Sequence, residues 1–212
     1  MKKLSQAKII AALTVALFTH LTVSGASAQS AYDGRPYQSA VRNQNPFGIC
    51  WSFATTAVME ASLLKQGITS DKAWHFSTYD TAYWATVYYR EESPDLNNPN
   101  ADSWGGLNNN AYRLSWRAGG LVAESVTPYP TAGQRPLPVP DANATRSGFT
   151  AHDVFYTDLN GTAGLQITKD YIRQYGAVSV DFLWNDASYD KDTYSFYDAT
   201  GIDDGGHAVT LT

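Results

Sequence analysis

A single cysteine, Cys50, constrains how this chain can be stabilised. One cysteine cannot form a disulfide within the chain, so the fold has to rest on its core, and one thiol alone is a poor metal site. Three roles remain for Cys50: a small buried hydrophobe, half of an intermolecular disulfide, or a nucleophilic thiolate. Its neighbours favour the third role. Gly48 before it and the aromatic Trp51 after it are typical of a loop that enters a helix, where the helix dipole and free backbone N–H groups stabilise a thiolate.

The first 28 residues have the three regions of a secretory signal peptide. Lys2 and Lys3 form a basic start, residues 9–23 are mostly apolar, and Ala26-Ser27-Ala28 is a small-residue cleavage site. A retained membrane anchor is less favoured, because polar residues interrupt the apolar stretch. We therefore expect cleavage near Ala28 and an exported protein that is secreted, periplasmic or at the cell surface. No stable membrane insertion is expected once the signal is removed.

The charge pattern excludes two classes of partner. The chain carries 15 basic and 20 acidic side chains, a net charge of −5, and contains no run of basic residues. Nucleic acid and anionic membrane surfaces are therefore not expected to bind it. The mature chain, residues 29–212, is long enough for one sizeable domain.

The first half of the mature chain is predicted to be helical. Apolar residues recur at helical spacing in three segments: residues 51–66, 76–91 and 107–118. Gly67 and Gly119 are natural ends for the first and third helices, and Ser77 or Thr78 can cap the second. Cys50 would then lie at the N-terminus of the first helix.

The second half has strand character. It follows residues 127–145, which contain five of the nine prolines and are predicted to form a long surface connection. Strand patterns cover residues 149–156, 177–182 and 208–211, and a short helix is predicted for residues 167–175.

The residues around Cys50 resemble the active-site block of the papain-like (C1-type) cysteine peptidases. The stretch Gln-Asn-Pro-Phe-Gly-Ile-Cys-Trp-Ser-Phe, which begins at Gln44, is similar to the family's Gln-x-x-x-Gly-Ser-Cys-Trp-Ala-Phe, with the same six-residue spacing from glutamine to cysteine. Two positions depart from that pattern. Ile49 replaces the usual serine, and Phe47 stands where many members have a disulfide cysteine.

Later blocks resemble the same family in the same order along the chain. Gly105-Gly106 precedes a helix, as in the family, and a Gly-Leu-Val…Pro-Tyr-Pro block begins at Gly120. Residues 176–180 are similar to the family's Gly-Pro-Val-x-Val strand. Residues 197–209 resemble the block that carries the catalytic histidine, which corresponds to His207.

The resemblance implies a fold and a reaction. The fold is α+β, with a mainly helical lobe over about residues 29–126 and an antiparallel β-rich lobe over about residues 127–212. The reaction is peptide-bond hydrolysis by a cysteine endopeptidase, with Cys50 as nucleophile and His207 as base and acid. Gln44 and the backbone N–H of Cys50 would hold the oxyanion. No metal or organic cofactor is implied.

Other residues are expected to bind protein or peptide substrates. Gly105 and Gly106 would expose backbone groups to an extended peptide. Trp51 would pack beneath the site, and Gly205 and Ala208 would leave the imidazole of His207 approachable through their small size. The other two histidines of the mature chain, His75 and His152, are predicted to be solvated or to act as caps. The sequence does not indicate an oligomeric state.

The chain departs from the family beyond His207. The Asn-Ser-Trp-Gly motif that orients the histidine in the family is absent, and the sequence ends at Thr212. We therefore expect an incomplete β-rich lobe, as in a C-terminally truncated enzyme of a bacterial secreted type. Two alternatives are a catalytically degenerate binding or scaffold protein, favoured by the missing asparagine and by Ile49, and a Cys-His hydrolase of cell-wall peptides.

Overall fold

The computed structural model describes residues 32–89, 105–134, 136–157, 161–197 and 205–212. The chain divides into two compact units, Met1–Ala31 and Tyr32–Thr212. The predicted signal peptide belongs to the first unit and lies outside the described residues. Within the described residues, no helix is both long and apolar enough to cross a membrane.

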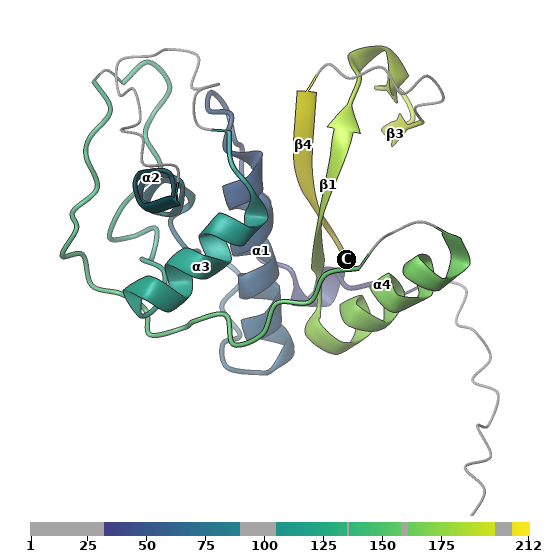
Figure 1. Ribbon diagram of the computed structural model, residues 1–212, viewed down its shortest axis with the longest axis horizontal. Coiled ribbons are helices and arrows are strands. Elements are labelled where there is room, and N and C mark those ends of the chain that lie inside the picture. Colours follow the sequence, from purple (N-terminus) through teal and green to yellow (C-terminus); the bar gives the residue numbers. More distant parts are fainter. Residues whose placement is uncertain (1–31, 90–104, 135, 158–160, 198–204) are drawn as a thin grey trace, which may run out of the picture. The chain divides into compact units, whose positions relative to one another are not determined.

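Helix α1, Cys50–Lys65, is the central element of the second unit. It contacts helices α2 (Thr78–Tyr89) and α3 (Asn108–Ala118), and it also contacts strands β1 (Val178–Trp184) and β4 (Gly205–Leu211) (Figure 1). Buried side chains therefore surround α1 instead of forming one stripe, as expected for a core helix. The predicted helix over residues 51–66 is confirmed with its start one residue earlier, at Cys50.

Local capping chemistry fixes the ends of α2 and α3, as the sequence predicted. The Ser77 hydroxyl accepts a hydrogen bond from the backbone N–H of Asp80 at 3.0 Å, which caps α2. Gly119 adopts a left-handed conformation, with φ of 71°, at the C-terminal end of α3. Helix α4, Gly161–Tyr175, begins six residues before the predicted helix and ends where that helix was predicted to end.

In the part of the chain that the structure describes, four short strands form two antiparallel pairs. Strands β1 and β4 pair in a register that places Phe182 opposite His207 and Asp181 opposite Ala208. Strands β2 (Tyr189–Asp190) and β3 (Ser195–Phe196) form the second pair. Two short 3₁₀ helices, Arg35–Tyr37 and Asp186–Ser188, complete the described elements. Helices and antiparallel strands together make the fold α+β, which confirms the predicted class.

The strand predicted over residues 149–156 is wrong, because this segment has no regular secondary structure. Side chains, and not a neighbouring strand, bind two of its backbone donors. The N–H of Ala151 donates to the Ser115 hydroxyl at 3.1 Å, and that of Phe149 donates to the Ser147 hydroxyl at 3.2 Å. Among the described residues no strand pairs with this segment, so its backbone is held by side chains in an irregular conformation.

The core joins the helices to the last strand. Ala208 of β4 is 6% exposed and belongs to the same buried cluster as Trp51 and Ala54 of α1. The Thr210 hydroxyl also donates a hydrogen bond to the backbone carbonyl of Ala54, at 3.3 Å. Burial and this hydrogen bond hold β4 against α1, and they determine where the candidate site forms.

Candidate active site

Cys50 is a half-buried free thiol at the first residue of α1. The loop before it is anchored by Phe47 and Ile49, which are 2% and 0% exposed. The carbonyl of Ile49 accepts hydrogen bonds from the N–H groups of Ser52 and Phe53, at 3.0 and 3.2 Å, and so closes the first turn. Because Ile49 is buried, its replacement of the serine of the resembled family adds to the core, and the neighbouring thiol remains at the N-terminus of α1.

The side chain of Gln44 is bound within the same loop. Its Nε2 donates to the backbone carbonyl of Phe47 at 3.1 Å. The backbone carbonyl of Gln44 accepts hydrogen bonds from the Phe47 N–H and the Tyr129 hydroxyl. These bonds make residues 44–47 a tight turn directly before α1. A primary amide has two hydrogens, and one bond to Phe47 leaves the second for another acceptor. A role for Gln44 at the oxyanion stays a prediction.

His207 lies on β4 among aromatic rings. The centroid of its ring is 5.8 Å from that of Phe182 and 5.5 Å from that of Trp184, both in edge-on contacts. Phe196 stacks on Trp184 at 5.2 Å, so the β2–β3 pair backs this group. Burial lowers the pKa of the His207 imidazole below its ordinary value.

Cys50 and His207 stand on neighbouring elements. Helix α1 and strand β4 run side by side in the same direction, so the start of the helix and the start of the strand lie at the same end (Figure 1). Alternation along β4 directs Thr210 toward α1 and places His207 on the opposite face, beside Phe182. Within the described residues, no hydrogen bond or ion pair joins Cys50 to His207. Their pairing stays a prediction.

Gly106 lies directly against Trp51. A Cβ atom built on Gly106 would be 2.5 Å from Cε2 of the Trp51 indole, closer than real side chains approach. Trp51 is 2% exposed, which agrees with its expected place beneath the site. Only glycine permits this approach, and the contact positions the backbone of residues 105–106 above the start of α1.

The remaining predicted substrate residues occupy different environments. Gly105 is exposed, next to Gly106. Gly205 begins β4 with φ of 146°, a conformation that glycine adopts readily, and Ala208 is buried in the core. The structure thus brings Trp51, Gly106 and Cys50 together at the start of α1, with Gly205 and His207 at the start of β4.

A buried carboxylate, Glu60, was missed by the sequence analysis. It is 2% exposed and accepts hydrogen bonds from Arg42 at 3.3 Å, from His75 at 3.1 Å, from the N–H of Phe76 at 2.8 Å and from the Ser39 hydroxyl. The prediction that His75 is solvated or a cap is wrong, because its side chain is 12% exposed and paired with this carboxylate. His152 is solvated as predicted, at 95% exposure. The feature of the sequence that could have indicated this network is Glu60 itself, a lone glutamate within an otherwise apolar helix.

Arg42 connects this network to the loop that leads to Cys50. Its guanidinium donates to Glu124 at 3.0 Å as well as to Glu60, and it lies 5.3 Å from the centroid of the Phe53 ring. The ion pairs therefore hold the polypeptide two residues before Gln44. Among the described residues, no group of three or more His, Cys, Asp and Glu side chains is arranged to hold a metal ion.

Comparison with known proteins agrees with the geometry around Cys50. The model of the family described as papain family cysteine protease matches residues 28–212. The match includes every residue that the structure describes. A search of the curated proteins finds no match.

Proposed function

The chain belongs to the papain family of cysteine proteases, and we propose that Cys50, His207 and Gln44 carry out its hydrolysis of peptide bonds. Family membership supports cysteine peptidase activity in general. The observation that carries the assignment of residues is the position of Cys50, a half-buried thiol at the N-terminus of α1, at the same end as the start of β4.

The proposed reaction begins with a thiolate at Cys50 and an imidazolium at His207. The sulfur attacks the scissile carbonyl carbon, a C–S bond forms, and the carbonyl electron pair moves to the oxygen. Gln44 Nε2 and the backbone N–H of Cys50 donate hydrogen bonds to that oxyanion. The C–N bond then breaks as His207 gives its proton to the leaving amine. In the second half, His207 takes a proton from water, and the resulting hydroxide attacks the thioester carbonyl carbon. The C–S bond then breaks, the carboxylic acid product leaves, and the thiolate and imidazolium are restored.

The imidazolium form of His207 needs a negative charge beside it. Burial alone disfavours the imidazolium, because it lowers the pKa of this group. A thiolate beside the ring would favour the imidazolium and offset that effect. The resting ion pair thus depends on both partners. The rate at which Cys50 is alkylated should therefore change when His207 is removed.

We propose protein or peptide substrates that lie extended along residues 105–106. These residues are held above the start of α1 by the contact between Gly106 and Trp51, and main-chain groups there can pair with a peptide backbone. The division into a helical lobe over about residues 29–126 and a β-rich lobe over about 127–212 belongs to the same proposal. The pattern of residues 1–28 supports export of the chain.

Alkylation of Cys50 by iodoacetamide across pH tests the assignment. We expect the wild-type chain to react at pH values well below those at which free cysteine reacts, and His207→Ala to lose that advantage while remaining folded. Gln44→Ala should keep the alkylation profile and lose turnover, by about 10²–10³-fold if it removes an oxyanion donor. Cys50→Ser is the blank. A folded wild-type chain that reacts like free cysteine, regardless of His207, would indicate a scaffold instead of an enzyme.

A substrate comparison separates the proposal from its closest chemical rival. Casein and peptidoglycan fragments are incubated with the same wild-type chain and with Cys50→Ser. Cleavage of casein that requires Cys50 supports the proposed peptidase. Cleavage confined to peptidoglycan fragments would assign the same residues to a cell-wall hydrolase.

A further inference from the structure

Asp181 lies between the two parts of the candidate active site. On β1 it pairs with Ala208, the residue that follows His207 on β4. Its Oδ1 accepts a hydrogen bond from Nδ2 of Asn108 at 2.8 Å, and Asn108 follows Gly106 by two residues. The carboxylate therefore connects the strand that carries the proposed base to the segment along which we propose that the substrate lies.

The side chain of Asp181 projects toward the helices and is open to solvent. Residues directly opposite each other in an antiparallel pair lie on the same face, and Ala208, opposite Asp181, is buried against α1. Asp181 is itself exposed, so a substrate can reach its carboxylate. The rest of β1 consists of apolar residues and one serine. A charge at such a position breaks the local pattern, which is typical of a functional site.

A buried amide holds the carboxylate in place. Asn108 is 6% exposed, and its Oδ1 accepts a hydrogen bond from the Thr55 hydroxyl at 3.3 Å while its Nδ2 donates to Asp181. The amide cannot turn over without losing both bonds, because its two ends have opposite hydrogen-bonding roles. The bond uses Oδ1 of Asp181, so Oδ2 can accept a hydrogen bond from a substrate.

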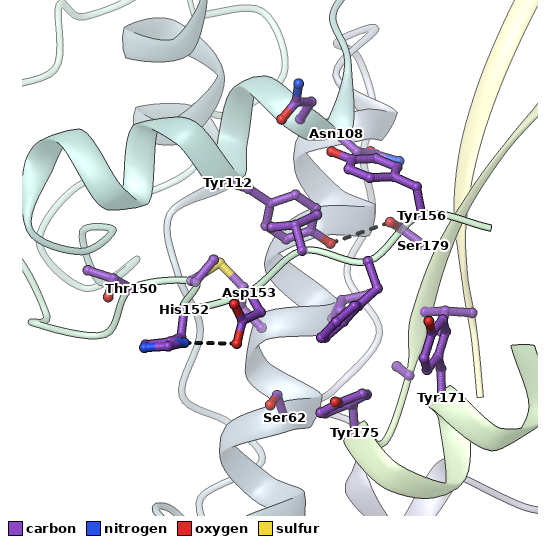
Figure 2. Close-up of a pocket in the computed structure, with 18 of the residues that line it drawn as sticks. Ser62, Asn108, Tyr112, Thr150, His152, Asp153, Tyr156, Tyr171, Tyr175 and Ser179 are labelled. Atoms are coloured by element: carbon purple, nitrogen blue, oxygen red, sulfur yellow. Dashed lines mark hydrogen bonds and ion pairs between the residues drawn. The ribbon is translucent and has the colours of Figure 1, made fainter. Parts of the chain in front are cut away.

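Asp181 lines one end of a cavity of about 1060 Å³. Figure 2 shows Tyr112, Tyr156 and Ser179 grouped with Asn108 at this end. Burial first and then the negative charge of Asp181 raise the pKa of Tyr156, so this ring lies within the field of the carboxylate. The two tyrosine rings offer apolar surface to the aliphatic stem of a long side chain. Among the described residues that line the cavity, none is Lys or Arg.

The segment that carries His207 is acidic as a whole. Residues 177–212 contain seven aspartates and one lysine, whereas the net charge of the entire chain is −5. A negative potential around a cleft raises the local concentration of cationic peptides and speeds their encounter with it. Such steering acts on any cationic peptide, whereas selection at one position of the substrate needs a fixed contact.

We propose that Asp181 is a specificity-determining residue, which selects a lysine or arginine side chain at one position of the peptide substrate. The ammonium or guanidinium group pairs with the carboxylate, and the aliphatic stem packs against Tyr112 and Tyr156. A neutral side chain in this place forms no ion pair, and an acidic one meets a like charge. This inference rests on the proposed peptidase function, because it names the side chain that the same cleft accepts.

The test uses peptide substrates that differ in one side chain. Lysine or its neutral counterpart norleucine is placed in turn at each position that flanks the scissile bond of a fluorogenic peptide, and kcat/KM is measured. We expect the wild-type chain to favour lysine by about fivefold at one position. Asp181→Asn keeps an oxygen for the bond from Asn108, and it should remove that preference.

Asp192→Asn is the matched control. It removes an equal charge from the same acidic segment, at an exposed position in the turn between β2 and β3. It should leave the preference for lysine within about twofold of the wild-type value, because exposed charges that are not in contact interact weakly.

A binding measurement separates this inference from the proposed function. The same lysine and norleucine peptides are titrated into Cys50→Ser, which lacks the proposed nucleophile, and binding is followed by fluorescence polarisation. If the wild-type chain cleaves none of the peptides, the proposed function fails, and the ratio of the two affinities on Cys50→Ser still decides whether the cleft selects a cation. Equal affinities there would overturn the inference.

Other results would overturn the inference while peptide cleavage persists. Equal kcat/KM for lysine and norleucine at every position would show that the cleft does not select a cation. A preference that survives Asp181→Asn would place the selecting group elsewhere, and one that Asp192→Asn also removes would reduce the effect to long-range steering. If Asp181→Asn does not fold by circular dichroism, Asp181→Ser removes the same charge and takes its place.

Discussion

The imidazole of His207 meets the indole of Trp184 at 70° between ring planes, with 5.5 Å between their centroids. Trp184 is in turn stacked on Phe196 and packed against Tyr189, at 5.2 and 5.3 Å. Rings from three strands therefore determine the environment of the histidine. The structure provides this shell through the pairing of β1 with β4, which brings residues 182 and 184 beside residue 207.

Replacing Trp184 with alanine should raise the pKa of His207. Burial lowers this pKa, so removing the indole exposes the imidazole and moves the value up toward its ordinary range. Loss of the ring contact, about 0.5–1.5 kcal/mol for an aromatic pair, should also lower turnover by up to about tenfold. A titration of His207 by NMR measures the first effect and peptidase kinetics the second.

Tyr189→Ala is the control for that change, because Tyr189 contacts Trp184 and, among the described residues, no ring contact joins Tyr189 to His207. We expect it to leave the titration of His207 unchanged. An unchanged titration in Trp184→Ala itself would contradict the role assigned to the indole.

Gly106→Ala should destabilise the fold. The new Cβ would lie 2.5 Å from the buried Trp51 indole, so either the ring or the backbone must move, at a cost of about 1–3 kcal/mol for overpacking. Urea unfolding followed by tryptophan fluorescence measures the change. Gly206→Ala is the matched control, since nothing lies within 4 Å of a Cβ atom built on Gly206. Its free energy of unfolding should stay within about 0.5 kcal/mol of the wild-type value. Equal stability of the two variants would refute the packing argument.

Glu60→Leu should be strongly destabilising. The change leaves the cationic Arg42 without its buried partner and removes the acceptor for the Phe76 N–H, which together cost about 3–5 kcal/mol. Denaturant unfolding of the variant gives the value. Glu124→Leu also loses a bond to Arg42, but its carboxylate is 26% exposed, so a clearly smaller cost is expected. A reversed order would show that Glu60 is not the centre of the network.

The carboxyl group of Asp80 should make stability depend on pH. Burial raises its pKa from 3.8 to about 6, although Arg146 lies 2.9 Å away and opposes the shift. Between these values the folded chain binds a proton that the unfolded chain does not, so the free energy of unfolding falls as pH rises from about 4 to about 6, by roughly 3 kcal/mol. Asp80→Asn should remove that fall. Unfolding curves at several pH values measure it, and an unchanged slope would contradict the assignment.

The sequence predicted those parts of the fold that depend on nearby residues. Ser77 and Gly119 mark helix ends because capping acts within a few residues, and the block around Cys50 placed the thiol at a helix start for the same reason. The two predictions that were wrong depend on contacts between residues that are not neighbours in the sequence. The segment 149–156 was predicted to be a strand, but among the described residues no strand pairs with it. His75 is largely buried because its side chain pairs with Glu60, 15 residues away.

The candidate site was predicted only in part for the same physical reason. Its residue types were identified from motifs, whereas the aromatic shell of His207 comes from the register of β1 with β4 and could not be read from any short segment. The contact between Gly106 and Trp51 likewise joins residues 55 positions apart, and only the folded chain shows why that position is glycine.

The hydrogen bond between Thr210 and Ala54 spans 156 residues and has a consequence for biosynthesis. Helix α1 is made early, but its contact with β4 cannot form until the ribosome has reached residue 210. At about 5–20 residues per second, this delay is roughly 8–30 s. Until then the thiol and the imidazole belong to parts of the nascent chain that have not met. The separation of these residues along the chain therefore delays assembly of the candidate site until residue 210 has been synthesised.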